Sequence, residues 1–199
     1  NIQTVNLTPE LVFGSHIEAG SLLGASNKSK VDGREKEFLD NFNKLGIDGI
    51  VAAGGDGTFD GLRRVSAGLK IIGVPKTIDN DLAGTEITFG YDTACAVVAE
   101  AADALRATAH AHRRIIVVET MGRTSGWIAL GGGLASLADA ILIPERPFDR
   151  THLKNFIIKK QESKTRGLIF VVSEGACAKN ESASIAFEVK DSPQKERFG

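Results

Sequence analysis

Short, continuously apolar segments alternate along this chain with longer segments of helical spacing. The apolar segments are residues 49–53, 70–74, 114–119, 140–143 and 167–173. A strand that is apolar at every position is typical of a parallel sheet covered on both faces, because neither side of the strand reaches water. The alternation of strands with helices therefore predicts an α/β fold with a doubly wound, mostly parallel sheet and helices on both of its faces.

Helical spacing covers residues 9–19, 33–45, 59–67, 92–109, 125–137 and 152–160. Thr8 before Pro9 indicates where the first helix begins, because a threonine hydroxyl caps a helix and proline suits its first turn. Gly46 indicates where the second helix ends. The polar segment 177–199 has no clear period, so we expect a loop with one weak helix there.

Composition argues against the nucleic-acid-binding, membrane and secreted classes. The 199 residues carry 24 Lys+Arg against 25 Asp+Glu, a net charge of −1, and no basic block. The most apolar stretch, residues 127–143, contains Asp139 and three consecutive glycines, which predicts a buried helix and strand instead of a membrane span. The first residues do not resemble a secretory signal, and Cys95 and Cys177 form no disulfide or metal-ligand pattern. We expect a cytoplasmic protein with reduced thiols.

Glycines, carboxylates and basic residues gather at the ends of four of the predicted strands. These clusters are GGDGT at 54–58, PKTIDND at 75–81, TMGR at 120–123 and SEG at 173–175. In an open parallel sheet, ligands bind beyond the carboxyl ends of the strands. The four clusters are therefore expected to surround one crevice.

The GGDGT cluster runs from a strand directly into a helix. Backbone N–H groups at a helix start have no partner within the helix, and glycines let an anion approach them closely. Phosphate binding is the natural use, with a Mg²⁺ ion between Asp56 and the phosphate oxygens. The alternative is a tight turn in which Asp56 acts as a cap.

The PKTIDND cluster places a hydroxyl and two carboxylates within five residues, at Thr77, Asp79 and Asp81. One carboxylate beside phosphate oxygens suits metal binding, and the other suits a general base that takes a proton from an attacking hydroxyl. No cysteine pair or histidine cluster lies nearby in the sequence, which argues against a zinc site. A surface turn rich in Asp and Asn is the alternative.

Arg123, Glu174 and Arg114 complete the candidate residues. Arg123 could clamp a phosphate or lie at the surface, and Glu174 could accept hydrogen bonds from sugar hydroxyls or begin a helix. Arg114 stands at the amino end of its strand, so it can serve the crevice only from a neighbouring subunit. The sequence has no GxSxG, GxxxxGK[ST] or GxGxxG motif, which argues against serine hydrolases, P-loop proteins and dinucleotide-binding proteins.

In this order and spacing, GGDGT, PKTIDND, ETMGR and SEGA resemble the motifs of the 6-phosphofructokinases. GGDGT also occurs in NAD kinases and lipid kinases, whereas PKTIDND followed by MGR is highly specific. The resemblance runs from about Thr8 to the end of the sequence. It implies Mg²⁺-dependent transfer of a phosphoryl group to the 1-hydroxyl of fructose 6-phosphate, which gives fructose 1,6-bisphosphate.

The resemblance also implies a role for each matching position. Asp79 corresponds to the general base, Thr77 to its neighbour on the transferred phosphate and sugar, and Arg123 to the cation that stabilises the transferring charge. Asp56 corresponds to the Mg²⁺-linked acid. The implied substrate site comprises Thr77, Asp79, Asp81, Arg114, Met121, Gly122, Arg123 and Glu174, and the implied donor site comprises Gly55, Asp56, Gly57, Thr58, Gly61 and Lys76.

Three of these correspondences are more specific. Glu174 matches the acid that binds the fructose hydroxyls. Gly61, inside the predicted helix, matches a glycine that leaves room for the nucleotide. Arg114 matches an arginine that reaches the sugar phosphate of a neighbouring subunit, which implies a homo-oligomer, either a dimer or a tetramer.

Two positions bear on the phosphoryl donor. In the 6-phosphofructokinases, glycine after GGD leaves space for the α-phosphate of ATP, so Gly57 favours ATP. Lysine before TIDND is usual in the pyrophosphate-dependent members, so Lys76 favours pyrophosphate. Because a steric block is harder to evade than an additional cation, we expect ATP and keep pyrophosphate as the alternative. A non-catalytic module that binds sugar phosphate or nucleotide is the alternative from another class.

The sequence resembles a central portion of the family. It lacks the family's opening glycine-rich loop and a later LGHIQRGG-like stretch, and Asn27, followed by Lys28, stands where an arginine often contacts phosphate. We expect residues 1–140 to bind the phosphoryl donor and residues 141–199 to begin the sugar-phosphate part. Full activity is expected to need the parts of the family that lie outside this portion.

Overall fold

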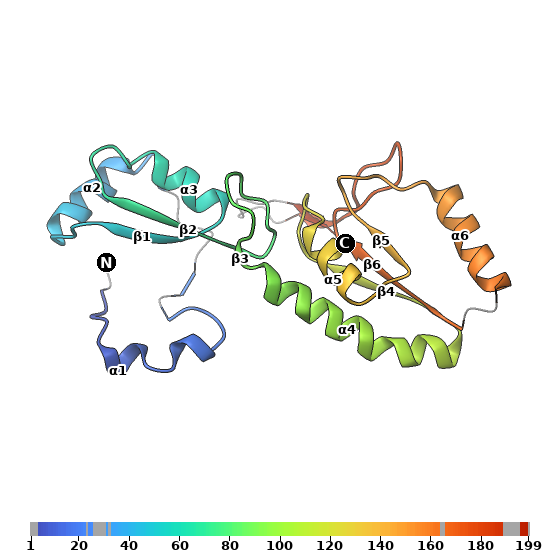
Figure 1. Cartoon of the computed structure of the whole chain (residues 1–199). Helices are drawn as coiled ribbons and strands as arrows, with labels where there is room; N and C mark the ends of the chain where they lie inside the picture. Colours follow the sequence, from blue (N-terminus) through green and yellow to red (C-terminus); the bar gives the residue numbers. More distant parts are fainter. Residues whose placement is uncertain are drawn as a thin grey trace.

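The computed structural model describes residues 4–22, 24–25, 31, 33–163, 166–188 and 196–198. Two three-stranded parallel sheets organise the chain (Figure 1). In spatial order, the first contains β1 (Ile50–Gly54), β2 (Ile71–Thr77) and β3 (Phe89–Gly90), and the second contains β4 (Ile115–Thr120), β6 (Leu168–Ser173) and β5 (Ala140–Leu142). The predicted α/β class is confirmed.

The helices connect and cover these strands. They are α1 (Pro9–Val12), the short 3-10 helix η1 (Ser15–Ile17), α2 (Glu35–Lys44), α3 (Asp56–Arg63), α4 (Tyr91–His112), α5 (Trp127–Ala135) and α6 (Arg150–Glu162). The strands form two sheets where the sequence predicts one, because β4, which follows the long helix α4, pairs with β6 and not with a strand of the first sheet. The 22 residues of α4 extend about 33 Å at 1.5 Å per residue. The carboxyl ends of both sheets face the middle of the molecule (Figure 1).

The second sheet contains the main core because helices cover both faces of its central strand. Ile169 and Val171 of β6 pack with Ala102 of α4 and are 1% and 0% exposed. Phe170 points to the opposite face, where its ring centroid lies 6.4 Å from that of Phe156 in α6. Coverage on both faces explains why β6 is apolar at nearly every position.

The first sheet is covered on one face by α3. Phe59 of α3 packs so closely on β2 that a Cβ at Gly73 would lie 2.9 Å from its ring. On the other face, the paired residues Val51 and Ile72 are 72% and 66% exposed. The prediction of helices on both faces therefore fits the second sheet, whereas the described residues cover the first sheet on one face.

Local capping signals predicted helix ends well. Thr8 Oγ1 accepts a hydrogen bond from the backbone N–H of Leu11 at 3.3 Å, which confirms the predicted start of α1. The helix predicted over 9–19 is interrupted because Gly14 adopts a φ of +84°, a conformation that an α-helix cannot accommodate. Gly46, with a φ of +64°, follows α2 as predicted.

The last segment contains an antiparallel pair of strands, β7 (Ile185–Glu188) with β8 (Glu196–Phe198), so the prediction of a loop with one weak helix is wrong there. The pairing joins two short segments, and the period within either segment is too brief to reveal it. Cys95 and Cys177 are free thiols, as predicted. Among the described helices, each is too short or too polar to cross a bilayer.

The predicted division at residue 140 into donor and sugar-phosphate parts stays a prediction. Strand pairing crosses that position, because β4 pairs with β6 in register from Ile115 and Leu168 to Thr120 and Ser173. Both strands therefore belong to one structural layer.

Candidate active site

Asp79 lies in the loop that follows β2, at the carboxyl edge of the first sheet. Its backbone N–H donates to Thr77 Oγ1 at 3.3 Å, so the loop folds back toward the end of the strand. Its carbonyl oxygen accepts a hydrogen bond from Ser125 Oγ at 2.7 Å. Because Ser125 belongs to the loop after β4, the carboxyl edges of the two sheets meet at Asp79.

The carboxyl group of Asp79 is half-buried, and its pKa is raised above the ordinary value. Burial is the largest cause, the carboxylates of Asp81 and Glu174 raise the pKa further, and Arg123 lowers it. A carboxylate with a raised pKa is a stronger base, so it is better suited to take a proton from a substrate hydroxyl. The structure thus brings Asp79, Arg123 and Glu174 within electrostatic reach of one another.

Asn80 also shapes this loop, although the sequence analysis did not single it out. It adopts a φ of +50°, and its Oδ1 accepts a hydrogen bond from the backbone N–H of Thr88 at 2.9 Å. Thr88 is 2% exposed and donates through Oγ1 to the Thr77 carbonyl oxygen at 2.6 Å. The available signal was an asparagine between two aspartates, because asparagine tolerates positive φ better than most residues.

We expect Asn80→Ala to lower the free energy of unfolding by about 2–3 kcal/mol, because it leaves the buried N–H of Thr88 unpaired and strains the backbone. Urea unfolding at pH 7 measures this change. Asn80→Gly is the matched control, since glycine accepts the φ of +50° and loses only the hydrogen bonds. The free energy of unfolding should therefore fall less in Asn80→Gly than in Asn80→Ala. Equal decreases in the two variants would contradict a contribution from backbone strain.

The loop after β4 holds Arg123 in a tight turn with positive φ, +135° at Gly122 and +51° at Arg123. Glu174 Oε1 accepts hydrogen bonds from the backbone N–H groups of Gly122, at 3.0 Å, and Arg123, at 2.8 Å. A Cβ at Gly175 would overlap the carbonyl oxygen of Arg123. Glu174 and Gly175, which directly follow β6, therefore fix this turn from two sides.

This geometry revises what was expected of Glu174. A turn follows β6, so the alternative in which Glu174 begins a helix is wrong. Its carboxylate instead organises the backbone of the Arg123 turn, a contact that no sequence pattern indicated. The predicted contact with sugar hydroxyls stays a prediction.

The GGDGT segment is more helical than the sequence predicts. Helix α3 begins at Asp56 instead of residue 59, and Gly55 is its N-cap, without a capping side chain. The N–H groups of Thr58 and Phe59 donate to the Gly55 carbonyl oxygen at 3.0 and 3.2 Å. Asp56 therefore stands exposed in the first turn of α3, where the alternative of Asp56 as the N-cap is wrong.

The GGDGT segment lies beside the loop that carries Asp79. Gly54 of β1 pairs with Pro75 of β2, and a Cβ at Gly55 would lie 3.5 Å from Cβ of Thr77. A side chain at Gly54 would overlap that of Thr58, so the threonine packs back over the strand end. A Cβ at Gly57 would meet no atom within 4 Å, and the space beside this glycine is open.

The other predicted site residues are spread more widely. Lys76 and Asp81 are exposed, and Met121 is 64% exposed. Gly61 lies inside α3, as the predicted helix over residues 59–67 implies. Arg114 is exposed and precedes β4, at the end of the second sheet opposite to Arg123, as its place in the sequence indicates. Asn27 and Lys28 lie outside the described residues.

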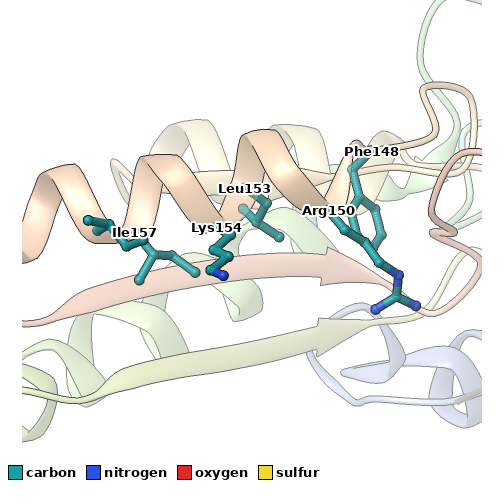
Figure 2. Close-up of a pocket in the computed structure, with 6 residues that line it drawn as sticks. Phe148, Arg150, Leu153, Lys154 and Ile157 are labelled. Atoms are coloured by element: carbon teal, nitrogen blue, oxygen red, sulfur yellow. The ribbon is translucent and has the colours of Figure 1, made fainter.

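A separate cavity of about 250 Å³ lies against α6 and contains none of the predicted site residues. Figure 2 shows Phe148, Leu153 and Ile157 among its lining residues, together with Arg150 and Lys154. Its lining is mainly apolar, which does not suit a phosphorylated sugar.

Comparison with known proteins decides the family. The family model described as phosphofructokinase matches residues 1–198. The chain belongs to the phosphofructokinase family. It is 39% identical to the ATP-dependent 6-phosphofructokinase 2 of Clostridium perfringens, over 100% of this chain and 58% of that protein. It is 41% identical to the pyrophosphate–fructose 6-phosphate 1-phosphotransferase of Amycolatopsis methanolica, over 92% of this chain and 53% of that protein.

A solved structure supports the same assignment. Phosphofructokinase from Saccharomyces cerevisiae superimposes with a TM-score of 0.70 at 32% identity, over 79% of this chain and 25% of that chain. The phosphofructokinase sequence described here thus spans a little over half the length of these curated bacterial relatives. Both donor types occur among them by name, so the family alone does not select the donor.

Proposed function

We propose that this chain supplies the phosphoryl-transfer site of a 6-phosphofructokinase, which converts ATP and fructose 6-phosphate into ADP and fructose 1,6-bisphosphate. The observation that carries the proposal is the half-buried Asp79, with its raised pKa, beside Arg123 and Glu174 where the two sheets meet. Relatives named as ATP-dependent 6-phosphofructokinases, 39% and 41% identical to the chain, support the same chemistry.

The proposed reaction is an in-line displacement. The 1-hydroxyl oxygen of fructose 6-phosphate bonds to the γ-phosphorus of ATP, the bond between that phosphorus and the ADP oxygen breaks, and the hydroxyl proton passes to the carboxylate of Asp79. Arg123 offsets the charge that develops on the transferring group, and Thr77 contacts the phosphate and the sugar. Catalysis of this kind depends on positioning and on charge stabilisation.

The donor site is proposed at the start of α3. Glycines 55 and 57 leave backbone N–H groups open to the donor phosphates, with Thr58, Gly61 and Lys76 nearby. Asp56 would hold Mg²⁺ together with the phosphates, and the ion would neutralise phosphate charge. One exposed carboxylate fits this ion, because Mg²⁺ is usually held by one or two carboxylates, substrate phosphates and water.

The sugar-phosphate side is proposed to use Asp81, Met121, Gly122 and Glu174. Arg114, at the far end of the second sheet, is proposed to serve the sugar phosphate of a neighbouring copy in a dimer or tetramer. A cytoplasmic location stays a prediction.

The donor is tested by assaying the chain side by side with ATP and with pyrophosphate, and then repeating the assay with Gly57→Asp. The variant should fold normally, because a Cβ at this position meets nothing within 4 Å. We expect loss of ATP-dependent kcat/KM by about 10²-fold or more, since a carboxylate would both fill the space and repel phosphate.

Gly57→Asn is the matched control, because asparagine has nearly the same size as aspartate but no charge. It therefore separates steric exclusion of the donor from charge repulsion of its phosphates. Pyrophosphate-dependent turnover that survives Gly57→Asp would overturn ATP as the donor, and it is the outcome that Lys76 and the Amycolatopsis relative favour. Binding of fructose 6-phosphate in calorimetry without turnover on either donor would instead support a non-catalytic binding module.

A further inference from the structure

We propose that Ser125 is a positioning residue that sets where Asp79 lies relative to Arg123; this inference rests on the proposed function of those two residues. Ser125 was not among the predicted site residues. It is 5% exposed, and its Oγ donates to the Asp79 carbonyl oxygen at 2.7 Å, across 46 residues of sequence. This hydrogen bond links the loop after β2 in the first sheet to the loop after β4 in the second.

The direction of the Ser125 hydroxyl is determined by a tight turn. The backbone N–H of Ser125 donates to the Gly122 carbonyl oxygen at 2.8 Å, which closes residues 122–125. A Cβ at Gly122 would overlap the Ser125 carbonyl oxygen, and Ser173 Oγ donates to that same oxygen at 3.4 Å. Because the turn also contains Arg123, a shift of Ser125 and a shift of Arg123 are coupled.

Asp79 is held on both sides of its backbone. Its N–H donates to Thr77 Oγ1 within its own loop, and its carbonyl oxygen accepts from Ser125 in the opposite loop. Loss of the second bond would let the loop move away from Arg123 and toward solvent. Burial is the largest cause of the raised pKa of Asp79, so movement toward solvent would lower that pKa. Glu174, which raises the pKa, and Arg123, which lowers it, would both act more weakly, whereas Asp81 lies in the same loop as Asp79.

The test compares Ser125→Ala with the unaltered 199-residue chain. We expect kcat to fall about tenfold, the KM for fructose 6-phosphate to change less than about threefold, and the acid limb of the pH–rate profile to move to lower pH. The same shift should appear without turnover, as a lower titration midpoint of the Asp79 carboxyl in NMR spectra of protein labelled at aspartate carboxyl carbons. A residue that contributes only to folding would not move this midpoint.

Ser136→Ala is the matched control. Ser136, the C-cap residue of α5, is 3% exposed, and its Oγ donates to the Gly133 carbonyl oxygen at 3.3 Å. It should lower stability without changing kcat or the titration of Asp79. Ser125→Cys keeps a weak hydrogen-bond donor, the S–H group, so the titration midpoint of Asp79 should lie between those of the unaltered chain and Ser125→Ala. This variant replaces Ser125→Ala in the test if the alanine variant does not fold.

The two proposals fail in different ways. An unaltered chain that binds neither fructose 6-phosphate nor either phosphoryl donor in calorimetry would refute the proposed function, while the titration of Asp79 would still test Ser125. An Asp79 midpoint that is the same in the unaltered chain, Ser125→Ala and Ser125→Cys would overturn the positioning role, whatever the turnover.

Discussion

Asp79→Asn is expected to lower kcat by about 10²–10⁴-fold, because asparagine cannot accept the proton of the substrate hydroxyl. The side chains have nearly the same size, so the KM for fructose 6-phosphate should change little. Steady-state assays with the preferred donor measure both constants. Asp103→Asn, at a carboxylate on α4 with a 66% exposed side chain, is the matched control and should leave kcat unchanged.

The same substitution should stabilise the fold at neutral pH. The pKa of Asp79 is raised in the folded state, mainly by burial, so the folded protein binds the proton more tightly than the unfolded chain does. The favourable contribution of the protonated form is present at low pH and is lost as the pH rises through the folded-state pKa. The Tm of Asp79→Asn should therefore exceed that of the unaltered chain at pH 7, and the difference should vanish below about pH 4.

A Tm difference that is independent of pH would contradict the assignment of a raised pKa to Asp79. An unchanged kcat would exclude Asp79 as the general base, and the proposed function would then lack its central residue.

Gly175→Ala is expected to lower kcat/KM by about 10²-fold and the free energy of unfolding by about 3 kcal/mol. The added Cβ would overlap the carbonyl oxygen of Arg123 and would lie 2.9 Å from its carbonyl carbon. The turn cannot yield easily, because Glu174 holds the N–H groups of Gly122 and Arg123 on its other side. Arg123 must therefore move, and if it has the proposed catalytic role, a shift of about 1 Å is enough for a loss of this size.

Assays of turnover and urea unfolding on the same preparation check both effects. Gly46→Ala is the control for general destabilisation. Gly46 has a φ of +64°, so alanine is strained there, but an added Cβ would meet no atom within 4 Å. Gly46 follows α2 and is far from Arg123 in the sequence. Gly46→Ala should lose about 1 kcal/mol of stability and no activity. Full activity in Gly175→Ala would show that the Arg123 turn is not fixed by its contact with Gly175.

Local signals in the sequence determined much of the fold. Continuous apolar runs located β1, β2, β4, β5 and β6, although only β6 is buried on both faces, and Val51 of β1 and Ile72 of β2 remain exposed. Thr8 and Gly46 located helix ends, because capping depends on neighbours a few residues away. The order of the motifs that contain Asp56, Asp79, Arg123 and Glu174 resembled that of the 6-phosphofructokinases, and the family model over residues 1–198 confirmed the family.

Tertiary structure decided what depends on distant partners. The division into two sheets depends on which strands pair, since β4 pairs with β6 and not with a strand of the first sheet. The pairing of β7 with β8 joins two segments that showed no strand pattern of their own. The carboxylate of Glu174 on the Arg123 turn, the close approach of Gly175, and the hydrogen bond from Ser125 to Asp79 each join residues at least 46 positions apart. Periodicity and propensity report which side of a segment is exposed to water and which local backbone conformation it favours. They do not report which residues from distant parts of the sequence will contact that segment.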